Sequence, residues 1–256
     1  MAPRASLDEL LAEGESADIT GWDFGWLARR ASEERPRWGY ARLLAERLAG
    51  ASAVLDVQTG GAEVLAEAAS SHRRPPVLLA ATESWPPNAA LAAAALRPLG
   101  GAVVRAADAG ALPFRDGTFS LVVSRHPTLT AWDEIARVLR PGGSYFSQQV
   151  GAGSNRELID YLMGPQPVSQ SRSARRAAAN ARSAGLTVTD LREQTLRVTF
   201  SDVGAVVYFL RKVLWTVPGF SVAGYREPLA RLHQKITAEG QFTCWSRRFL
   251  IEARKR

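Results

Sequence analysis

The sequence Ser52-Ala-Val-Leu-Asp-Val-Gln-Thr-Gly-Gly-Ala-Glu63 decides the fold of this chain. It begins with a short apolar run, residues 53–55, which is typical of a buried strand. It ends with Gly60 and Gly61, and good helix formers follow. The stretch therefore predicts a strand, a tight turn and a helix. The first N–H groups of such a helix have no partner within it and can hold an anion, and glycines let a ligand come close.

Four more apolar runs follow and are typical of buried strands. They cover residues 77–81, 102–107, 119–124 and 144–147. Helical patterns lie between them, among them residues 88–96 and 132–140, and we expect Gly142 and Gly143 to end the second. Strands that alternate with helices predict a parallel sheet with right-handed crossovers.

Several of these pieces resemble the class I S-adenosylmethionine-dependent methyltransferases, and most closely the methyltransferase type 11 group. The matching pieces occur in the family's order and spacing, and they are residues 55–61, Glu83, 108–114, 119–122 and 134–143. The resemblance covers about residues 50–150. It implies an α/β fold with a doubly wound, Rossmann-like sheet of about seven strands, the last one antiparallel, and helical cap elements. The family's Gly-x-Gly-x-Gly loop is altered at two of its three glycines, where this chain has Gln58 and Ala62.

Ligands of doubly wound sheets bind outside the carboxyl ends of the strands. The resemblance implies that loop 58–61 faces the methionyl part of S-adenosylmethionine, that Glu83 faces the ribose and that Asp108 faces the adenine. The expected cofactor-binding residues are Asp56, Gln58, Thr59, Gly60, Gly61, Glu83, Ser84, Asp108, Ala109, Ser124 and Arg125. Asp56 could instead only orient the loop.

His126 is the one histidine at the carboxyl end of an expected strand. An imidazole has an ordinary pKa suited to proton transfer near neutral pH. His126 is therefore our candidate general base, and a purely structural role is the alternative. Methyl transfer from a sulfonium needs mainly positioning and exclusion of water, so no fixed catalytic triad is expected.

Composition limits the class of protein. A chain of 256 residues that is 46% hydrophobic and 22% charged can form a globular domain with a large core. The single cysteine, Cys244, excludes an intramolecular disulfide and fits a reducing compartment, so we expect a cytoplasmic protein. We expect no signal peptide, no membrane span and no metal site, since the three histidines lack ligand spacing.

Positive charge is concentrated in the second half of the chain. Residues 1–150 hold 15 Lys and Arg against 17 Asp and Glu, whereas residues 151–256 hold 17 against 8. A basic half could meet nucleic acid or an acidic substrate. The alternative is a compositional preference for arginine, because only three residues of the chain are lysines.

We expect one domain over residues 1–256. Residues 1–50 would form a helical and aromatic cap, residues 51–151 the cofactor-binding core, and residues 152–256 a C-terminal half with a helical insertion at 201–240. In that half we expect two helices within 154–185, strands at 186–200 and 242–254, and a helix at 225–239.

Large apolar side chains gather in two segments that flank the core in sequence. They suggest a mostly apolar pocket for the methyl acceptor, and the candidates for it are Trp22, Trp26, Tyr208, Arg211 and Trp215, with Phe209 and Phe220. Plain core packing of the 202–220 helix is the alternative.

Three functions remain open from the sequence. The first is an S-adenosylmethionine-dependent methyltransferase that acts on a small, largely apolar or aromatic molecule. The second is an RNA methyltransferase that uses the basic half. The third is a non-catalytic binding protein that kept the fold and lost the cofactor through Gln58 and Ala62. The sequence predicts no oligomeric state.

Overall fold

The computed structural model describes residues 5–20, 24–71 and 76–256. Its contacts divide the chain into two compact units that interleave along the sequence. Unit 1 consists of Met1–Arg35, Gly153–Ser169 and Thr195–Arg247, and unit 2 consists of Pro36–Ala152, Gln170–Gln194 and Arg248–Arg256. Each unit is described by itself below, and the single domain expected from the sequence stays a prediction.

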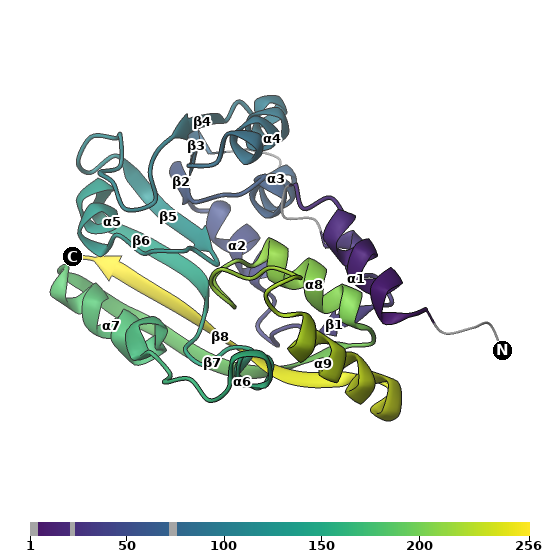
Figure 1. Cartoon of the computed structure of the whole chain (residues 1–256). Coiled ribbons are helices and arrows are strands. Elements are labelled where there is room, and N and C mark those ends of the chain that lie inside the picture. The colour runs from purple at the N-terminus through teal and green to yellow at the C-terminus, as the bar shows by residue number, and fades with distance from the viewer. Residues whose placement is uncertain (1–4, 21–23, 72–75) are drawn as a thin grey trace. The chain divides into compact units, whose positions relative to one another are not determined.

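Unit 2 contains the parallel sheet that the apolar runs predict (Figure 1). Five strands lie in the order β6-β5-β2-β3-β4, and every neighbouring pair is parallel. The strands are β2 (Ala53–Val57), β3 (Leu78–Glu83), β4 (Ala102–Arg105), β5 (Phe119–Arg125) and β6 (Leu139–Val150). β8 (Phe242–Lys255) pairs antiparallel with β6. The predicted fold, with an antiparallel last strand, is confirmed.

Helices cover both faces of this sheet. The side chains of Ala53, Leu55 and Val57 on β2 face a core formed with α5 (Trp132–Val138) and α7 (Ala174–Ser183). Val54 faces the opposite core, which is formed with α2 (Tyr40–Leu48), α3 (Glu63–Ser70) and α4 (Pro86–Leu96). Short 3-10 turns follow at Arg97–Leu99 and Gln170–Arg172. Because α3 follows β2 onto one face and α5 follows β5 onto the other, the switch point of the doubly wound sheet lies between β2 and β5.

The start of β6 differs from the expectation. α5 ends at Val138, and Leu139 already pairs with Phe119, so Gly142 and Gly143 lie within a strand and do not end a helix. The register of β5 and β6 shifts at this point, and Gly142 has φ +75°. A bulge with a residue in the left-handed region favours glycine, which explains Gly142. At Gly143 the reason is space, because a Cβ there would lie 2.9 Å from the Arg140 carbonyl oxygen.

Unit 1 is built from helices and strand segments around its own core. Its elements are α1 (Leu7–Ser16), a 3-10 turn at Gly25–Leu27, β1 (Ala31–Glu33), α6 (Arg156–Met163), α8 (Val203–Lys212) and α9 (Arg226–Glu239), with the unit 1 parts of β7 (Leu186–Phe200) and β8. β1 pairs antiparallel with β7 and was not expected, because three residues carry no alternating pattern. Among the described helices, none is long and apolar enough to cross a membrane.

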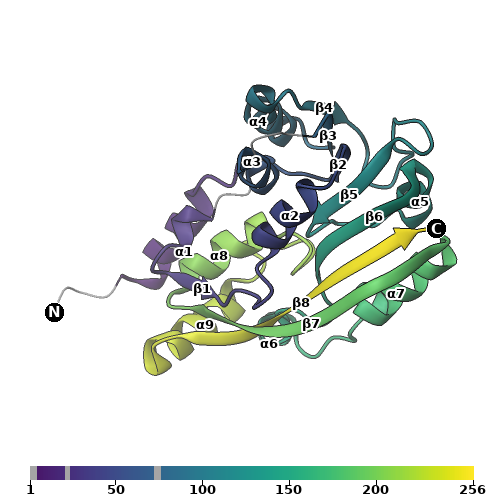
Figure 2. The same cartoon turned by 180° about the vertical axis from the view of Figure 1, so that it is seen from behind.

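α8 is shorter than the 202–220 helix expected from the sequence. It ends at Lys212, and Val213 leaves the helical region. Pro218 lacks an N–H and disfavours a helical residue before it, and β-branched residues precede it. α1 lies alongside α8 in both views (Figures 1 and 2). The two backbones are so close that a Cβ on Gly14 would lie 2.5 Å from the Gly204 carbonyl oxygen.

Candidate functional site

The loop after β2 keeps a left-handed backbone at three alternate positions. φ is +59° at Gln58, +66° at Gly60 and +62° at Ala62. These are the positions of the three glycines in the resembled family. The loop therefore keeps a backbone conformation that favours glycine, although Gln58 and Ala62 carry side chains there. A residue with a Cβ costs about 1–2 kcal/mol in this region. Strain of this kind persists where the surroundings impose it, and it is common at binding sites.

The Gln58 side chain crosses from the end of β2 to the loop after β5. Its Nε2 donates to the Leu129 carbonyl at 2.7 Å, and its Oε1 accepts from the Thr128 backbone N–H at 2.7 Å. The Thr128 hydroxyl lies 3.0 Å from Gln58 Oε1 and 2.6 Å from Asp108 Oδ2, and it donates to one of them at a time. We call Gln58, Thr128 and Leu129 the Gln58 bridge. It spans the switch point of the sheet.

Three carboxylates stand at the ends of β2, β3 and β4. Asp56 and Glu83 are buried, each 7% exposed, and Asp108 is half-buried. Burial raises the pKa of Asp56 to about 7, the Thr59 hydroxyl opposes this, and the charge of Glu83 adds to it. Burial also raises the pKa of Glu83, against the bonds from the backbone N–H groups of Trp85 and Gly60. The three carboxylates make the site acidic, although two arginines lie near it: Arg125 acts on Asp56 through its charge, and Arg172 Nη2 donates to the Thr128 carbonyl at 2.9 Å.

Asp56 has one oxygen that accepts a hydrogen bond and one that has no partner among the described residues. Oδ2 accepts from the Thr59 hydroxyl at 2.7 Å. Oδ1 is buried and accepts no hydrogen bond from any described residue. Such an orphan costs about 1–3 kcal/mol, and more for a charged group. A donor or a cation on a ligand would satisfy it.

Glu83 holds the loop after β2 against the end of β3. Its Oε2 accepts from Gly60 N at 2.8 Å and its Oε1 from Trp85 N at 2.9 Å. Each carboxylate oxygen can accept a second bond, so the expected ribose contact is compatible with these two. Ser84 follows as a half-exposed residue, Gly61 is buried in the loop, and Ala109 is exposed beyond Asp108.

The residues at the end of β5 point in different directions. The Ser124 hydroxyl is buried and bonds to the Tyr145 hydroxyl at 2.7 Å and to the Ser147 hydroxyl at 2.9 Å. Its side chain is therefore used within the sheet. Arg125 is exposed, and it opposes the raised pKa of Asp56 through its charge.

His126 has an unexpected pair of neighbours. Its Nε2 lies 2.8 Å from Gln148 Nε2, and Trp38 Nε1 donates to Gln148 Oε1 at 2.7 Å. The backbone of His126 is left-handed, with φ +56°, and its N–H donates to the Gln148 carbonyl at 2.7 Å. Burial and the charges of Arg248 and Arg125 hold the pKa of His126 well below its ordinary value. No sequence pattern pointed to Trp38 or Gln148, since they meet across 110 positions.

The expected acceptor residues lie in unit 1, except Trp22, which is outside the described residues. Trp26 stacks on the buried Tyr208, with ring centroids 4.8 Å apart. Phe209 and Phe220 pack against the same core. Arg211 Nη1 donates to the carbonyls of Gly14 and Ala17, at 2.8 and 2.9 Å. Trp215 is 38% exposed in the turns after α8. Most of these aromatic side chains thus contribute to packing.

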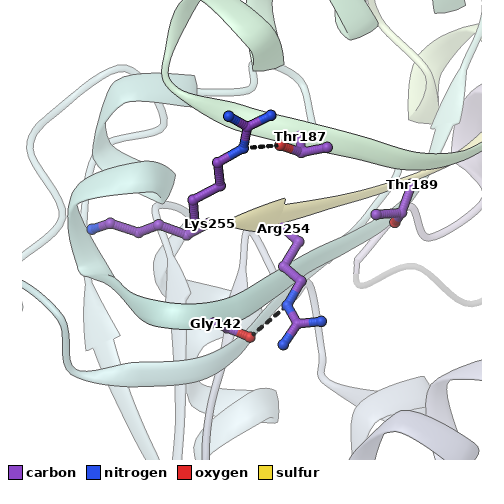
Figure 3. A pocket seen from close by; sticks show the side chains of 6 residues that line it. Gly142, Thr187, Thr189, Arg254 and Lys255 are labelled. Atoms are coloured by element: carbon purple, nitrogen blue, oxygen red, sulfur yellow. Dashed lines mark hydrogen bonds between the residues drawn. The ribbon is translucent and has the colours of Figure 1, made fainter.

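A shallow groove of about 360 Å³ lies at the other end of the unit 2 sheet, where β6 begins (Figure 3). Its lining residues are Gly142, Thr187, Thr189, Arg254, Lys255 and Arg256. Arg254 Nε donates to the Gly142 carbonyl at 3.2 Å, and the Lys255 side chain turns away to the carbonyls of Ala136 and Leu139. None of the expected site residues lines this groove. In the described ranges, no three His, Cys, Asp or Glu side chains are placed to hold a metal.

Residues 55–147 match the sequence pattern of the methyltransferase domain family. No curated protein matches the chain in sequence. Its fold is similar to that of the YcgJ protein from Bacillus subtilis, with a TM-score of 0.59 and 15% identity over 86% of this chain and 99% of that one. The [4+2]-cyclase SpnF has a TM-score of 0.53 and 20% identity over 97% and 91% of the two chains. The fold is also similar to that of a geranyl diphosphate methyltransferase solved in complex with geranyl diphosphate and sinefungin. Its TM-score is 0.51, with 15% identity over 84% of this chain and 76% of that one.

Proposed function

Because residues 55–147 carry a methyltransferase domain of the class I type, we propose that the protein transfers a methyl group from S-adenosylmethionine to a small acceptor. The single observation that carries this proposal is the buried Asp56, whose Oδ1 has no partner among the described residues. It lies beside a loop that keeps the glycine conformation at three positions. S-adenosylmethionine brings an ammonium group and a sulfonium, and when bound it supplies an activated methyl group.

The residues at the carboxyl ends of the strands fit this cofactor in charge. Asp56, Glu83 and Asp108 form an acidic group in which two members have raised pKa values, so a cationic ligand would relieve their repulsion. Asp56 would accept from the ammonium group, and Glu83 would accept from the ribose. The part of these carboxylates in the reaction is to bind and orient S-adenosylmethionine, because the leaving group of this transfer is neutral and needs no proton.

The altered loop is compatible with binding only if the Gln58 bridge opens or accommodates the ligand. The bridge crosses the switch point, where the methionyl part would lie. This observation favours a second candidate, a protein with the same fold that does not methylate. The [4+2]-cyclase among the similar structures shows that the fold also occurs in a protein described by another activity.

We propose that the acceptor is small and largely apolar or aromatic. Of the candidates on unit 1, Trp215 is exposed, Tyr208 is buried, and the others are half-buried, namely Trp26, Phe209, Arg211 and Phe220. RNA is less well supported, because many basic side chains of the second half face carboxylates. These pairs are Arg156–Asp160, Arg192–Asp190, Arg197–Glu34, Arg226–Asp8, Arg231–Glu227 and Lys235–Glu239.

Calorimetric titration with S-adenosylmethionine and S-adenosylhomocysteine tests the cofactor proposal. Binding of both ligands is expected, and no heat from either at millimolar concentration would rule out the enzyme. Titration of a single-stranded RNA at low salt tests the RNA alternative, for which the exposed arginines of α7 (Arg175, Arg176 and Arg182) are the matched sites to replace.

A further inference from the structure

The tautomer of His126 follows from a chain of two hydrogen bonds. An indole N–H can only donate, so the atom of Gln148 that faces Trp38 must be the carbonyl oxygen. The other end of the Gln148 amide is then its NH₂ group, and this group faces His126 Nε2 at 2.8 Å. Because an NH₂ group donates, Nε2 must accept with its lone pair. The proton of the neutral imidazole is therefore on Nδ1.

Gln148 also holds the backbone of His126. Gln148 is 3% exposed, and its backbone carbonyl accepts the His126 N–H at 2.7 Å. His126 is fixed at two points in a left-handed conformation that is strained for a residue with a Cβ. A strained residue that is held in place at a strand end points to a function for its side chain.

The Nδ1 atom of His126 is the part left for a ligand. It makes no hydrogen bond to any residue in the described part of the chain. It is also not enclosed, because the buried polar side-chain atoms without a partner among the described residues are Asp56 Oδ1, Asn88 Oδ1 and Ser246 Oγ. His126 follows β5 directly, and the Gln58 bridge reaches the same loop two and three residues later. The free N–H thus belongs to the loop at the switch point.

We infer that Trp38 and Gln148 lock His126 as a neutral imidazole, whose Nδ1–H donates a hydrogen bond to an oxygen of the ligand at the carboxyl ends of β2 and β5. The ligand part rests on the proposed function. The tautomer part does not. In this tautomer the one ring lone pair, on Nε2, already accepts from the Gln148 NH₂ group and none is left at Nδ1, so His126 is a positioning residue and not the general base suggested by its place in the sequence. The acceptor must then bring a nucleophile that needs no proton removed by His126.

The charged groups that act on His126 support the neutral form. Arg125 precedes it on β5 and Arg248 lies on β8, and both disfavour a second proton on the ring, in the same direction as burial. An imidazolium would also require Nε2 to donate toward the Gln148 NH₂ group, so two donors would face each other.

Nitrogen NMR of the full chain with labelled imidazole rings tests the tautomer directly. The chain has three histidines, and His126→Asn assigns the signal, since asparagine tolerates the left-handed region. We expect a protonated Nδ1 and an unprotonated Nε2 that do not change between about pH 5 and 8. A protonated Nε2, or an ordinary titration in this range, would overturn the inference.

Two matched variants test the role of the Gln148 amide. Gln148→Glu replaces the NH₂ donor with a carboxylate oxygen, which favours a proton on Nε2, so the tautomer should change and the pKa of His126 should rise. Gln149→Glu makes the same change on the next residue, whose amide bonds to Thr130 and Tyr145, and it should leave the His126 signal unchanged. Equal effects of the two variants would contradict the proposed lock.

Titration of the labelled protein identifies the ligand oxygen. S-adenosylhomocysteine should shift the Nδ1 signal, and 5′-methylthioadenosine, which lacks the amino-acid part, should not if the oxygen is the carboxylate. A shift with both ligands points to an oxygen of the nucleoside. His126→Asn should weaken binding of the responsible ligand about tenfold, which is about 1.4 kcal/mol. If calorimetry detects binding of S-adenosylhomocysteine but the Nδ1 signal does not shift, the ligand part of the inference is wrong. If calorimetry detects no binding, the proposed function is wrong, and the tautomer result is unaffected.

Discussion

The carboxyl ends of β2 and β5 and the α1–α8 helix pair are held together in opposite ways. At the strand ends, Gln58, Ala62 and His126 have strained backbones, and Asp56 has a buried oxygen without a partner among the described residues. In the helix pair, Arg30 donates to both oxygens of Asp202, at 2.8 and 2.7 Å, and Asp202 also accepts from the first turn of α8. The aromatic rings there stack on one another.

The difference distinguishes polar groups that a ligand would satisfy, at the strand ends, from groups that stabilise the fold, in the helix pair. A protein tolerates an unpaired buried carboxylate or a left-handed side chain only where the surroundings impose it, and functional sites are the common case. The helix pair offers no such unsatisfied group in the contacts given above. We therefore expect variants at the strand ends to change ligand binding and variants in the helix pair to change stability.

The largest effect is expected from Glu83→Ala on cofactor binding. Loss of a carboxylate that accepts from the ribose should cost about 2–4 kcal/mol in binding of S-adenosylhomocysteine, allowing for non-additivity of two charge-assisted bonds. Calorimetry measures it. Glu67→Ala removes an exposed glutamate from α3 and is the matched control. A loss of less than threefold would show that Glu83 does not bind the ribose and only holds the loop.

Gly14→Ala should act on stability alone. Its Cβ would lie 2.5 Å from the Gly204 carbonyl oxygen, which is backbone and cannot turn away. We expect a loss of about 2 kcal/mol, seen as a fall in Tm of about 4–8 °C. Gly50→Ala has open space around it and should change stability by less than about 0.5 kcal/mol. Equal Tm values for the two variants would show that the helix pair is not close-packed.

Asp56→Asn should change stability and binding in opposite directions. The pKa of Asp56 is raised from 3.8 to about 7, so the folded state loses stability as pH rises between these two values, and the full cost of the ionised form is present above about pH 7. At about pH 8 we expect the variant to be more stable by about 1–2 kcal/mol and to bind S-adenosylhomocysteine at least about tenfold more weakly. Chemical unfolding and calorimetry measure the two. A variant that is both less stable and unchanged in binding would mean that Asp56 only supports the loop.

Gln58→Gly should give the smallest effect, about 1 kcal/mol. Glycine relieves the left-handed strain and removes the Gln58 bridge, so stronger cofactor binding is expected if the bridge blocks the methionyl part. Weaker binding would show that the Gln58 amide itself contacts the cofactor. Ala62→Gly is the matched control, because it relieves the same strain without touching the bridge.

Much of the fold could be predicted from the sequence, because buried parallel strands are apolar runs that end in polar residues. Residues 53–55 and 119–124 lie in β2 and β5. The bulge at Gly142 could not be predicted, since a glycine after a helical pattern fits a helix end equally well. The strand β1 has no pattern of its own and exists through its pairing with β7.

The candidate site was predictable only where position along the chain determines it. Asp56 and Glu83 follow from their places at strand ends. Trp38 and Gln148 do not, because a hydrogen bond between residues 110 positions apart leaves no periodic trace. Aromatic density in residues 202–220 suggested a pocket, yet in the structure Tyr208 and Phe209 pack within unit 1. Composition alone does not distinguish these two uses of an aromatic side chain.

The most direct test of the cofactor site is titration of the unaltered protein with S-adenosylhomocysteine at about pH 6 and pH 8. The pKa of Asp56 is raised to about 7, and the ammonium group of the ligand binds its ionised form. Affinity should therefore rise with pH across this range, and binding at the lower pH should release a proton, which calorimetry in buffers of different ionisation enthalpy detects. Binding that is independent of pH, or no binding at all, would contradict the assignment of this acidic group to the cofactor.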